Sequence, residues 1–179
     1  MVNLEHTQKT LEKFRDYVIQ QSRSNLTKGG KNVSKQLYNE IKGEVKVSPN
    51  SFQLGFEMPM YGQFQDKGVK GKFKSSKAPN SPFKFGSGTG LRGGLTKGIE
   101  KWVATKGFQF RDKKSGKFMS YKDTAFLISR SIYTTGLRPS LFFTKPFEAG
   151  YKKYIDEDLI TQFALDVEDL MKYTLKDIK

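Results

Sequence analysis

The chain has no cysteine and only one histidine, His6, among its 179 residues. Without cysteine it can form no disulfide framework, no thiolate metal site and no cysteine nucleophile. A single histidine cannot build a multi-histidine metal centre, and it argues against a histidine-paired nucleophile. We therefore expect no metal-binding residues and no catalytic residues.

Long apolar runs are also missing. No stretch of about 18 apolar residues is present, which is the minimum for a helix that crosses a bilayer. The segment Met1–Val18 is interrupted by charged residues and lacks the apolar centre of a signal peptide. We expect a protein that folds in a cytoplasm-like compartment and contacts no membrane.

Motifs for nucleotide binding are weak. The Walker-type phosphate loop is absent, and the one literal Gly-x-Gly-x-x-Gly match covers residues 88–93. A dinucleotide site needs a buried strand directly before the glycines, but Ser81–Phe85 carries a proline and a lysine. The acidic cluster Asp156–Asp158 is typical of a solvated helix start. We predict that the protein is not an enzyme and uses no cofactor.

Positive charge, by contrast, is abundant and concentrated. Residues 61–122 hold 15 lysines and arginines against three acidic residues, a net charge of +12 out of +14 for the whole chain. Residues 151–179 are slightly acidic, with five lysines against seven aspartates and glutamates. This asymmetry predicts that the middle of the chain faces an anionic partner, either nucleic acid or an acidic protein surface.

Within this region, residues 62–94 lack any periodic apolar face and are rich in glycine, lysine, serine and proline. A connection of this length is far longer than the usual ~4 to 6 residues. We predict an extended basic arm or loop that is inserted into a single domain, residues 1–179. The arm either docks on protein, binds nucleic acid through lysines and stacking aromatics, or is a solvated insertion.

The apolar spacing predicts secondary structure along the rest of the chain. Helices are expected over residues 3–23, 34–42, 95–106, 124–135 and 154–178. Hairpins are expected over residues 44–58 and 108–121, and an edge strand over 137–146. The predicted class is α+β, with a small antiparallel sheet packed against N-terminal, middle and C-terminal helices.

Three groups of residues are candidates for function or assembly. Aromatic residues of the arm, expected to contact a neighbouring subunit or partner, are Tyr61, Phe64, Phe73, Phe83 and Phe85. Basic residues expected to face DNA or an acidic surface are Lys67, Lys70, Lys72, Lys74, Lys77, Lys84 and Arg92. Residues expected to anchor the core are Trp102, Leu141, Phe142, Phe143 and Phe147.

Two segments carry a resemblance to a known family. Met60–Gly68 follows the first predicted hairpin, and Gly136–Phe147 lies between two predicted helices. Their order resembles the tail-completion or head-to-tail connector family of tailed bacteriophages. Members of that family carry a Tyr-Ala-x-x-Val-Glu-x-Gly-like segment and later an Arg-Pro-Phe-Leu-like segment. Here Gly62 stands at the alanine position, and Ser140-Leu141 separate Arg138-Pro139 from the phenylalanines.

The resemblance implies a structural virion protein of the neck or tail region, assembled in the cytoplasm of a host bacterium. It implies a homo-oligomeric ring, six- or twelve-fold, around the DNA channel, which joins the portal side of the head to the tail. Its partners would be other neck, portal or tail proteins, with non-specific contact to channel DNA. The alternative is a small basic protein that binds nucleic acid through the arm.

Overall fold

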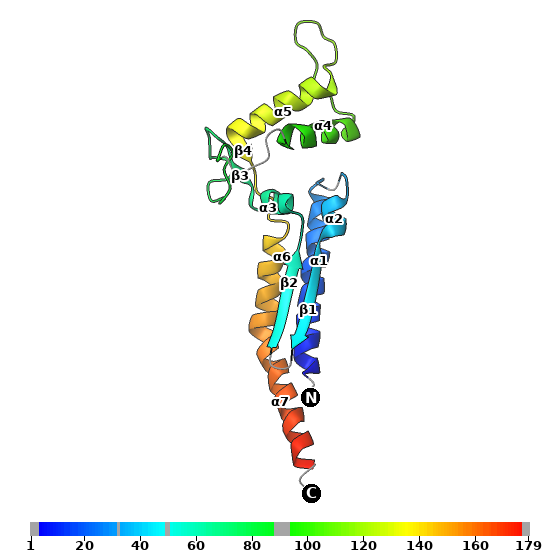
Figure 1. Ribbon diagram of the computed structural model, residues 1–179, viewed down its shortest axis with the longest axis vertical. Helices are drawn as coiled ribbons and strands as arrows, with labels where there is room; N and C mark the ends of the chain where they lie inside the picture. The colour runs from blue at the N-terminus through cyan, green and yellow to red at the C-terminus, as the bar shows by residue number, and fades with distance from the viewer. Residues whose placement is uncertain (1–3, 32, 49–50, 88–93, 177–179) are drawn as a thin grey trace. The chain divides into compact units, whose positions relative to one another are not determined.

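The computed structural model describes residues 4–31, 33–48, 51–87 and 94–176 (Figure 1). Its mixture of helices and short antiparallel strands confirms the predicted α+β class. We predicted one domain, and the chain packs as two compact units. Unit 1 comprises residues 1–32, 36–59 and 142–179, and unit 2 comprises residues 33–35 and 60–141.

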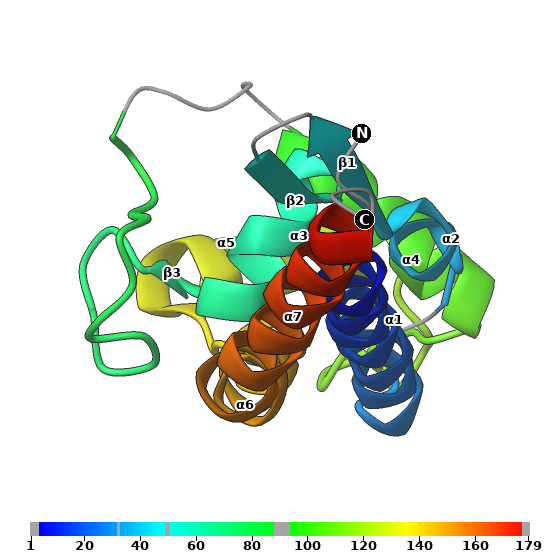
Figure 2. The same cartoon turned by 90° about the horizontal axis from the view of Figure 1, so that it is seen from below.

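Unit 1 is built from the two ends of the chain and one hairpin. In chain order its elements are α1 (Glu5–Lys28), α2 (Gln36–Glu40), β1 (Lys42–Ser48), β2 (Ser51–Glu57), α6 (Thr144–Gly150), the π-helical η1 (Tyr151–Leu159) and α7 (Ile160–Lys176). Helix α1 lies alongside α6 and α7, and the hairpin covers one face of this helical layer (Figures 1 and 2).

The hairpin forms where the alternating sequence predicted it. Strands β1 and β2 pair antiparallel from Lys42↔Glu57 to Ser48↔Ser51. Every second side chain of β2 turns inward, so that Phe52, Leu54 and Phe56 are half-buried. Phe56 packs edge-on against Phe143 of the other chain end, with ring centroids 5.5 Å apart. The pleat of the strand therefore decides which residues reach the helices.

Helix α1 extends further than the pattern predicted. Its apolar stripe buries Leu11, Phe14 and Val18 as expected, and it continues through Leu26 to Lys28. Leu26 is buried in a cluster with Leu37, Ile41 and Phe142. This burial stabilises the last turn of α1, residues 24–28, which lies beyond the predicted end of the helix at residue 23.

Unit 2 holds the basic middle of the chain. Its elements are α3 (Met60–Lys67), β3 (Val69–Lys70), α4 (Gly94–Lys106), α5 (Tyr121–Thr135) and β4 (Gly136–Leu137). Helices α4 and α5 pack on each other, with Val103, Thr124 and Ala125 fully buried. Ser120 is the N-cap of α5, because its hydroxyl accepts the Asp123 N–H at 3.0 Å.

Two predicted elements differ from the structure. Between residues 108 and 121 the only strand pairing in the described chain is an isolated bridge, Arg111↔Phe118. The predicted edge strand 137–146 is two residues long, because helix α6 already begins at Thr144. Pro146 lies in the first turn of α6, where its missing N–H breaks no helical bond.

Over the described part of the predicted arm or loop, residues 62–87, the chain forms most of α3, then β3, and then an irregular loop from residue 71 onward. Backbone groups of this segment are hydrogen-bonded. The Lys70 N–H donates to the Phe83 carbonyl at 2.8 Å, and the Lys72 N–H donates to the Tyr133 carbonyl at 2.8 Å. Small residues are buried in it, including Ala78 and Ser81. The segment is held by backbone hydrogen bonds and by the packing of Phe83 and Phe85, and these contacts leave no periodic apolar pattern in the sequence.

Candidate interaction surfaces

Met60–Gly68 and the start of the second segment that carries the family resemblance, residues 136–141, lie together in unit 2, whereas residues 142–147 belong to unit 1. Strand β3 pairs with β4 through Val69↔Leu137. The N–H of Ser140 donates to the Asp66 carbonyl at 3.0 Å, and its hydroxyl donates to the Gln65 carbonyl at 2.6 Å. The last carbonyls of an α-helix have no hydrogen-bond partner within the helix. For α3, Ser140 supplies these partners from a distant part of the chain. We call this site the motif junction.

Glycine makes the motif junction possible at two places. Gly68 has φ +71°, and a Cβ there would lie 2.5 Å from the Leu137 carbonyl oxygen. A Cβ on Gly71 would lie 2.3 Å from the carbonyl oxygen of Thr134. Only a residue without a side chain allows the backbones to approach this closely. The glycines of this segment thus serve packing, although the composition suggested flexibility.

The predicted basic residues of the arm lie mostly at the surface. Lys67, Lys72, Lys74 and Lys84 are exposed, and Lys70 is half-buried. Lys77 is also half-buried, and its ammonium donates to the Thr135 hydroxyl at 2.7 Å. Arg92 and the Gly-x-Gly-x-x-Gly match lie outside the described residues.

The predicted aromatic residues of the arm separate into two groups. Phe64 and Phe83 pack edge to face, with ring centroids 4.7 Å apart, and Phe85 packs against Tyr133 of α5. These three are half-buried and hold unit 2 together. Tyr61 and Phe73 are exposed, Phe73 by 73%. Only these two described aromatics of the arm are placed to meet a partner.

The predicted core anchors are placed correctly in three cases. Phe142 is buried in the core of unit 1, and Phe143 and Phe147 pack on Phe56 of β2. Leu141 is half-buried at the motif junction, where its N–H donates to the Asp66 carbonyl. Trp102 is not a core residue, because it is 40% exposed. The neighbouring Val103 faces the α4–α5 contact in its place.

A surface that the sequence analysis missed lies on the loop between α4 and α5 and the first turns of α5 (Figure 1). Its exposed apolar side chains are Phe108, Phe110, Phe118, Tyr121, Phe126 and Leu127. Its basic residues are Lys106, Arg111, Lys113, Lys114, Lys117 and Lys122, against two acids, Asp112 and Asp123. We call it the α4–α5 tip.

The turn of the α4–α5 tip is ordered by its own polar groups. One oxygen of Asp112 accepts the Ser115 N–H at 2.7 Å and the Ser115 hydroxyl at 2.9 Å. Bonds from the Ser115 backbone and side chain hold the pKa of this carboxyl below its usual value. The Arg111 guanidinium lies 4.6 Å from the Phe118 ring centroid, a cation–π contact. These contacts give the turn of the α4–α5 tip a defined conformation.

A second missed surface lies on the C-terminal helix. The helical spacing predicted that Phe163, Val167 and Leu170 point inward, but Phe163 is 50% exposed, and Asp166 is the buried residue of this turn. The preceding π-helical turns of η1 are wider than α-helical turns, so they shift the phase of all residues after them. The resulting outward face, the α7 stripe, consists of Ile160, Phe163, Val167, Leu170 and Met171.

The buried carboxylate of Asp166 has a structural explanation. Its oxygens accept the Thr7 N–H at 2.8 Å, the Thr7 hydroxyl at 2.6 Å and the His6 N–H at 3.0 Å. Burial raises the pKa of Asp166, but these hydrogen bonds outweigh it and lower the pKa overall. The carboxylate therefore caps the positive end of α1. It needs no catalytic role.

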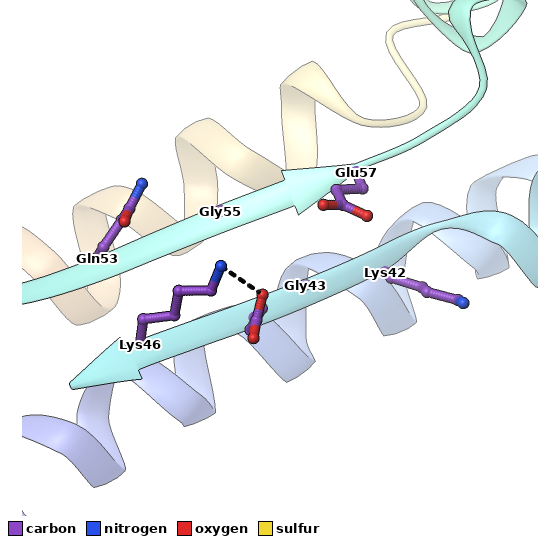
Figure 3. Close-up of a pocket in the computed structure, with 7 residues that line it drawn as sticks. Lys42, Gly43, Lys46, Gln53, Gly55 and Glu57 are labelled. Atoms are coloured by element: carbon purple, nitrogen blue, oxygen red, sulfur yellow. Dashed lines mark ion pairs between the residues drawn. The ribbon is translucent and has the colours of Figure 1, made fainter.

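The outer face of the hairpin forms a shallow polar depression (Figure 3). Lys42, Glu44, Lys46, Gln53 and Glu57 line it, and Lys46 pairs with Glu44 at 3.3 Å. Both charged groups are well exposed, so this pair is a weak surface contact.

The described residues contain no group of three or more aspartate, glutamate or histidine side chains placed to hold a metal ion. Among the described helices, none is long and apolar enough to span a bilayer. No protein-family model matches the chain, and neither a curated protein nor a solved structure gives a significant match to it.

Proposed function

We propose that this chain is a structural virion protein, a subunit of a connector or tail-completion ring between the head and tail of a phage. The observation that carries the proposal is the motif junction. The two segments that resemble the connector family are hydrogen-bonded to each other at Gln65, Asp66 and Ser140. Segments so distant in sequence that meet in one site support a shared structural role.

The distribution of charge also supports this role. Unit 2 contains 18 lysines and arginines against four acidic residues, so it carries a net charge of +14. Unit 1 has 14 of each and is neutral. A ring subunit with one strongly basic unit can turn that unit toward channel DNA or an acidic adjoining ring, while the neutral unit packs without repulsion. The place of action is then the neck or tail of the virion.

The mass of the purified protein tests the proposal. We expect light scattering to show an assembly of several 20.4 kDa chains, formed by the protein alone or when an adjoining ring protein is added. Treatment with nuclease should leave that assembly intact, because protein contacts hold it. A protein that stays monomeric both alone and with an adjoining ring protein, and that co-purifies with nucleic acid, would contradict the proposal.

A second candidate is a nucleic-acid-binding protein. It is favoured by the exposed pair Lys72 and Phe73, in which the Lys72 ammonium lies 5.4 Å from the Phe73 ring centroid. A lysine beside an exposed ring is the arrangement used for sequence-tolerant binding of single strands.

Replacement of Lys67, Lys72 and Lys74 by glutamine tests this alternative. If the protein binds single-stranded DNA through these side chains, the slope of log affinity against log salt should fall by about one per lysine. Replacement of Lys42, Lys46 and Lys145, exposed lysines of unit 1, is the control. Equal effects of the two triple variants would exclude the arm as a specific binding surface.

A further inference from the structure

We infer that the α4–α5 tip of one copy docks on the α7 stripe of a second copy. The inference rests on the proposed function, because it names the contact that would build the ring. Large apolar side chains are exposed on two surfaces, one in each unit of the chain. Such surfaces on a folded chain indicate interaction sites.

The α7 stripe has the properties of one side of a helix interface. Ile160 and Met171 are 74% and 61% exposed, and they lie eleven residues apart on the same face of the helix. Helix α7 has 17 residues and is about 25 Å long at 1.5 Å per residue. Beside the stripe, Asp166 is bound to the first turn of α1 within unit 1.

The α4–α5 tip has the properties of the other side. Phe126 and Leu127 are 55% and 41% exposed on α5, and Phe108 and Phe110 form an edge-to-face pair with ring centroids 5.2 Å apart. Aromatic side chains like these supply much of the buried area at protein interfaces.

Charge selects the pairing of these surfaces. The tip carries six basic residues against two acids. Around the stripe, residues 151–176 carry five acids at the surface against four lysines, besides the buried Asp166, and Asp156, Glu157 and Asp158 are exposed at one end. Two tips would repel each other, and two acidic helices gain nothing from charge. A tip on a stripe brings opposite charges together and covers both apolar surfaces at once.

Nucleic acid fits these observations less well as the occupant. It could bind the basic tip, but it would leave the α7 stripe uncovered and would be repelled by the acids around it. A second copy accounts for both surfaces. Because the two surfaces differ, the contact is head-to-tail, and such a contact closes into a ring when its rotation closes.

Two variants that each disable one surface test the inference. The stripe variant carries Phe163→Ser and Met171→Ser, and the tip variant carries Phe126→Ser and Leu127→Ser. The control is Val47→Ser, which removes an apolar side chain that is 53% exposed on the hairpin. All three replace exposed residues, and circular dichroism with thermal unfolding checks that each remains folded.

We expect the wild type and the control to form the same assembly in light scattering, and each double variant alone to be a monomer. An equimolar mixture of the two double variants should form a dimer and nothing larger. In that dimer the intact tip of the stripe variant docks on the intact stripe of the tip variant, and the remaining two surfaces are disabled. A contact of tip with tip or of stripe with stripe cannot give this result.

Several outcomes would overturn the inference. A double variant that keeps the wild-type assembly shows that its surface is not the contact, and the proposed ring would then use another interface. A mixture that stays monomeric excludes the head-to-tail pairing. A wild type that is monomeric at every concentration excludes docking between copies, and addition of an adjoining ring protein then decides the proposed function separately.

Discussion

Asp166 is a buried carboxylate whose oxygens bind the first turn of another helix. The N-cap residue of α1 is Leu4, which has no side-chain group to bind the free N–H groups there. Asp166 of α7 takes that place by accepting from His6 and Thr7. A single side chain thus caps α1 and fixes the α1–α7 contact.

We predict that Asp166→Asn lowers the free energy of unfolding of unit 1 by about 1–3 kcal/mol, because a buried N–H loses a charged acceptor. Urea unfolding followed by circular dichroism measures the change. The matched control is Glu168→Gln, two residues away on the same helix, where the carboxylate pairs with Lys172 in full solvent. An equal loss in both variants would refute the capping role.

The same carboxylate predicts a pH dependence. The folded state holds the pKa of Asp166 below the ordinary value of 3.8. Its stabilisation is therefore complete above pH 3.8 and is lost as the pH falls through the lower folded-state pKa. The difference in unfolding free energy between wild type and Asp166→Asn should be constant from pH 7 to 5 and should shrink toward pH 3. A difference that grows on acidification would show that another group is responsible.

Gly71 gives a second prediction at the scale of one residue. A Cβ at this position would meet backbone atoms of Thr134, Gly136 and Lys74 at 2.3–2.6 Å. Backbone cannot rotate away as a side chain can, so Gly71→Ala should destabilise unit 2 by about 1–3 kcal/mol or more. In α4, a Cβ on Gly98 would lie in open space, so Gly98→Ala should raise the free energy of unfolding of unit 2 by about 0.5–1 kcal/mol. Hydrogen exchange of α4 and α5 amides measures both.

At the scale of elements, the C-terminal helix shows how local geometry redirects a sequence pattern. Helical segments α6, η1 and α7 follow one another without a break from Thr144 to Lys176. Because η1 is π-helical, the residues after it are rotated relative to the positions that a regular α-helix would give them. Asp166 of α7 faces α1, and the exposed apolar residues of this helix lie on more than one side of it, with Leu165 and Tyr173 off the α7 stripe.

The start of α5 is stabilised by its cap. Ser120 accepts the Asp123 N–H, and its hydroxyl donates to the Asp123 carboxylate at 2.6 Å. We predict that Ser120→Ala lowers the free energy of unfolding by about 1 kcal/mol and speeds amide hydrogen exchange in the first turn of α5 about fivefold. Ser131→Ala, in the exposed interior of the same helix, should leave exchange there unchanged. Similar exchange in both variants would mean that packing on α4 alone orders this turn.

At the scale of the molecule, the two units differ in charge and in how the chain builds them. Unit 1 is neutral and made from both chain ends, whereas unit 2 is an insertion that carries the whole net charge. Met58 and Phe143 both pack around the core of unit 1, so the chain leaves and re-enters this unit at neighbouring points.

We predict that replacement of residues 60–141 by a short glycine and serine linker leaves unit 1 folded. Its core residues, Leu26, Leu37, Ile41 and Phe142, are all retained. Circular dichroism should show a helical protein that unfolds cooperatively, and the shortened chain should no longer bind a cation-exchange resin. Loss of cooperative unfolding would mean that unit 1 depends on unit 2 for its stability.

The sequence by itself determined the α+β class, the β1–β2 hairpin, the α5 cap and the anchoring role of Phe142, Phe143 and Phe147. These features depend on local spacing and on residue types whose preference is strong. It also located the excess positive charge, which is a sum over residues and needs no structure.

Only the tertiary structure decided the rest. The arm is folded because backbone groups of residues 69–85 find partners near Tyr133 and Gly136, and such pairing leaves no apolar pattern. The exposure of Phe163 and Leu170 depends on how little of α7 the rest of unit 1 covers, and the exposure of Trp102 depends on which face of α4 meets α5. Each of these outcomes depends on contacts between distant residues, which local spacing does not encode.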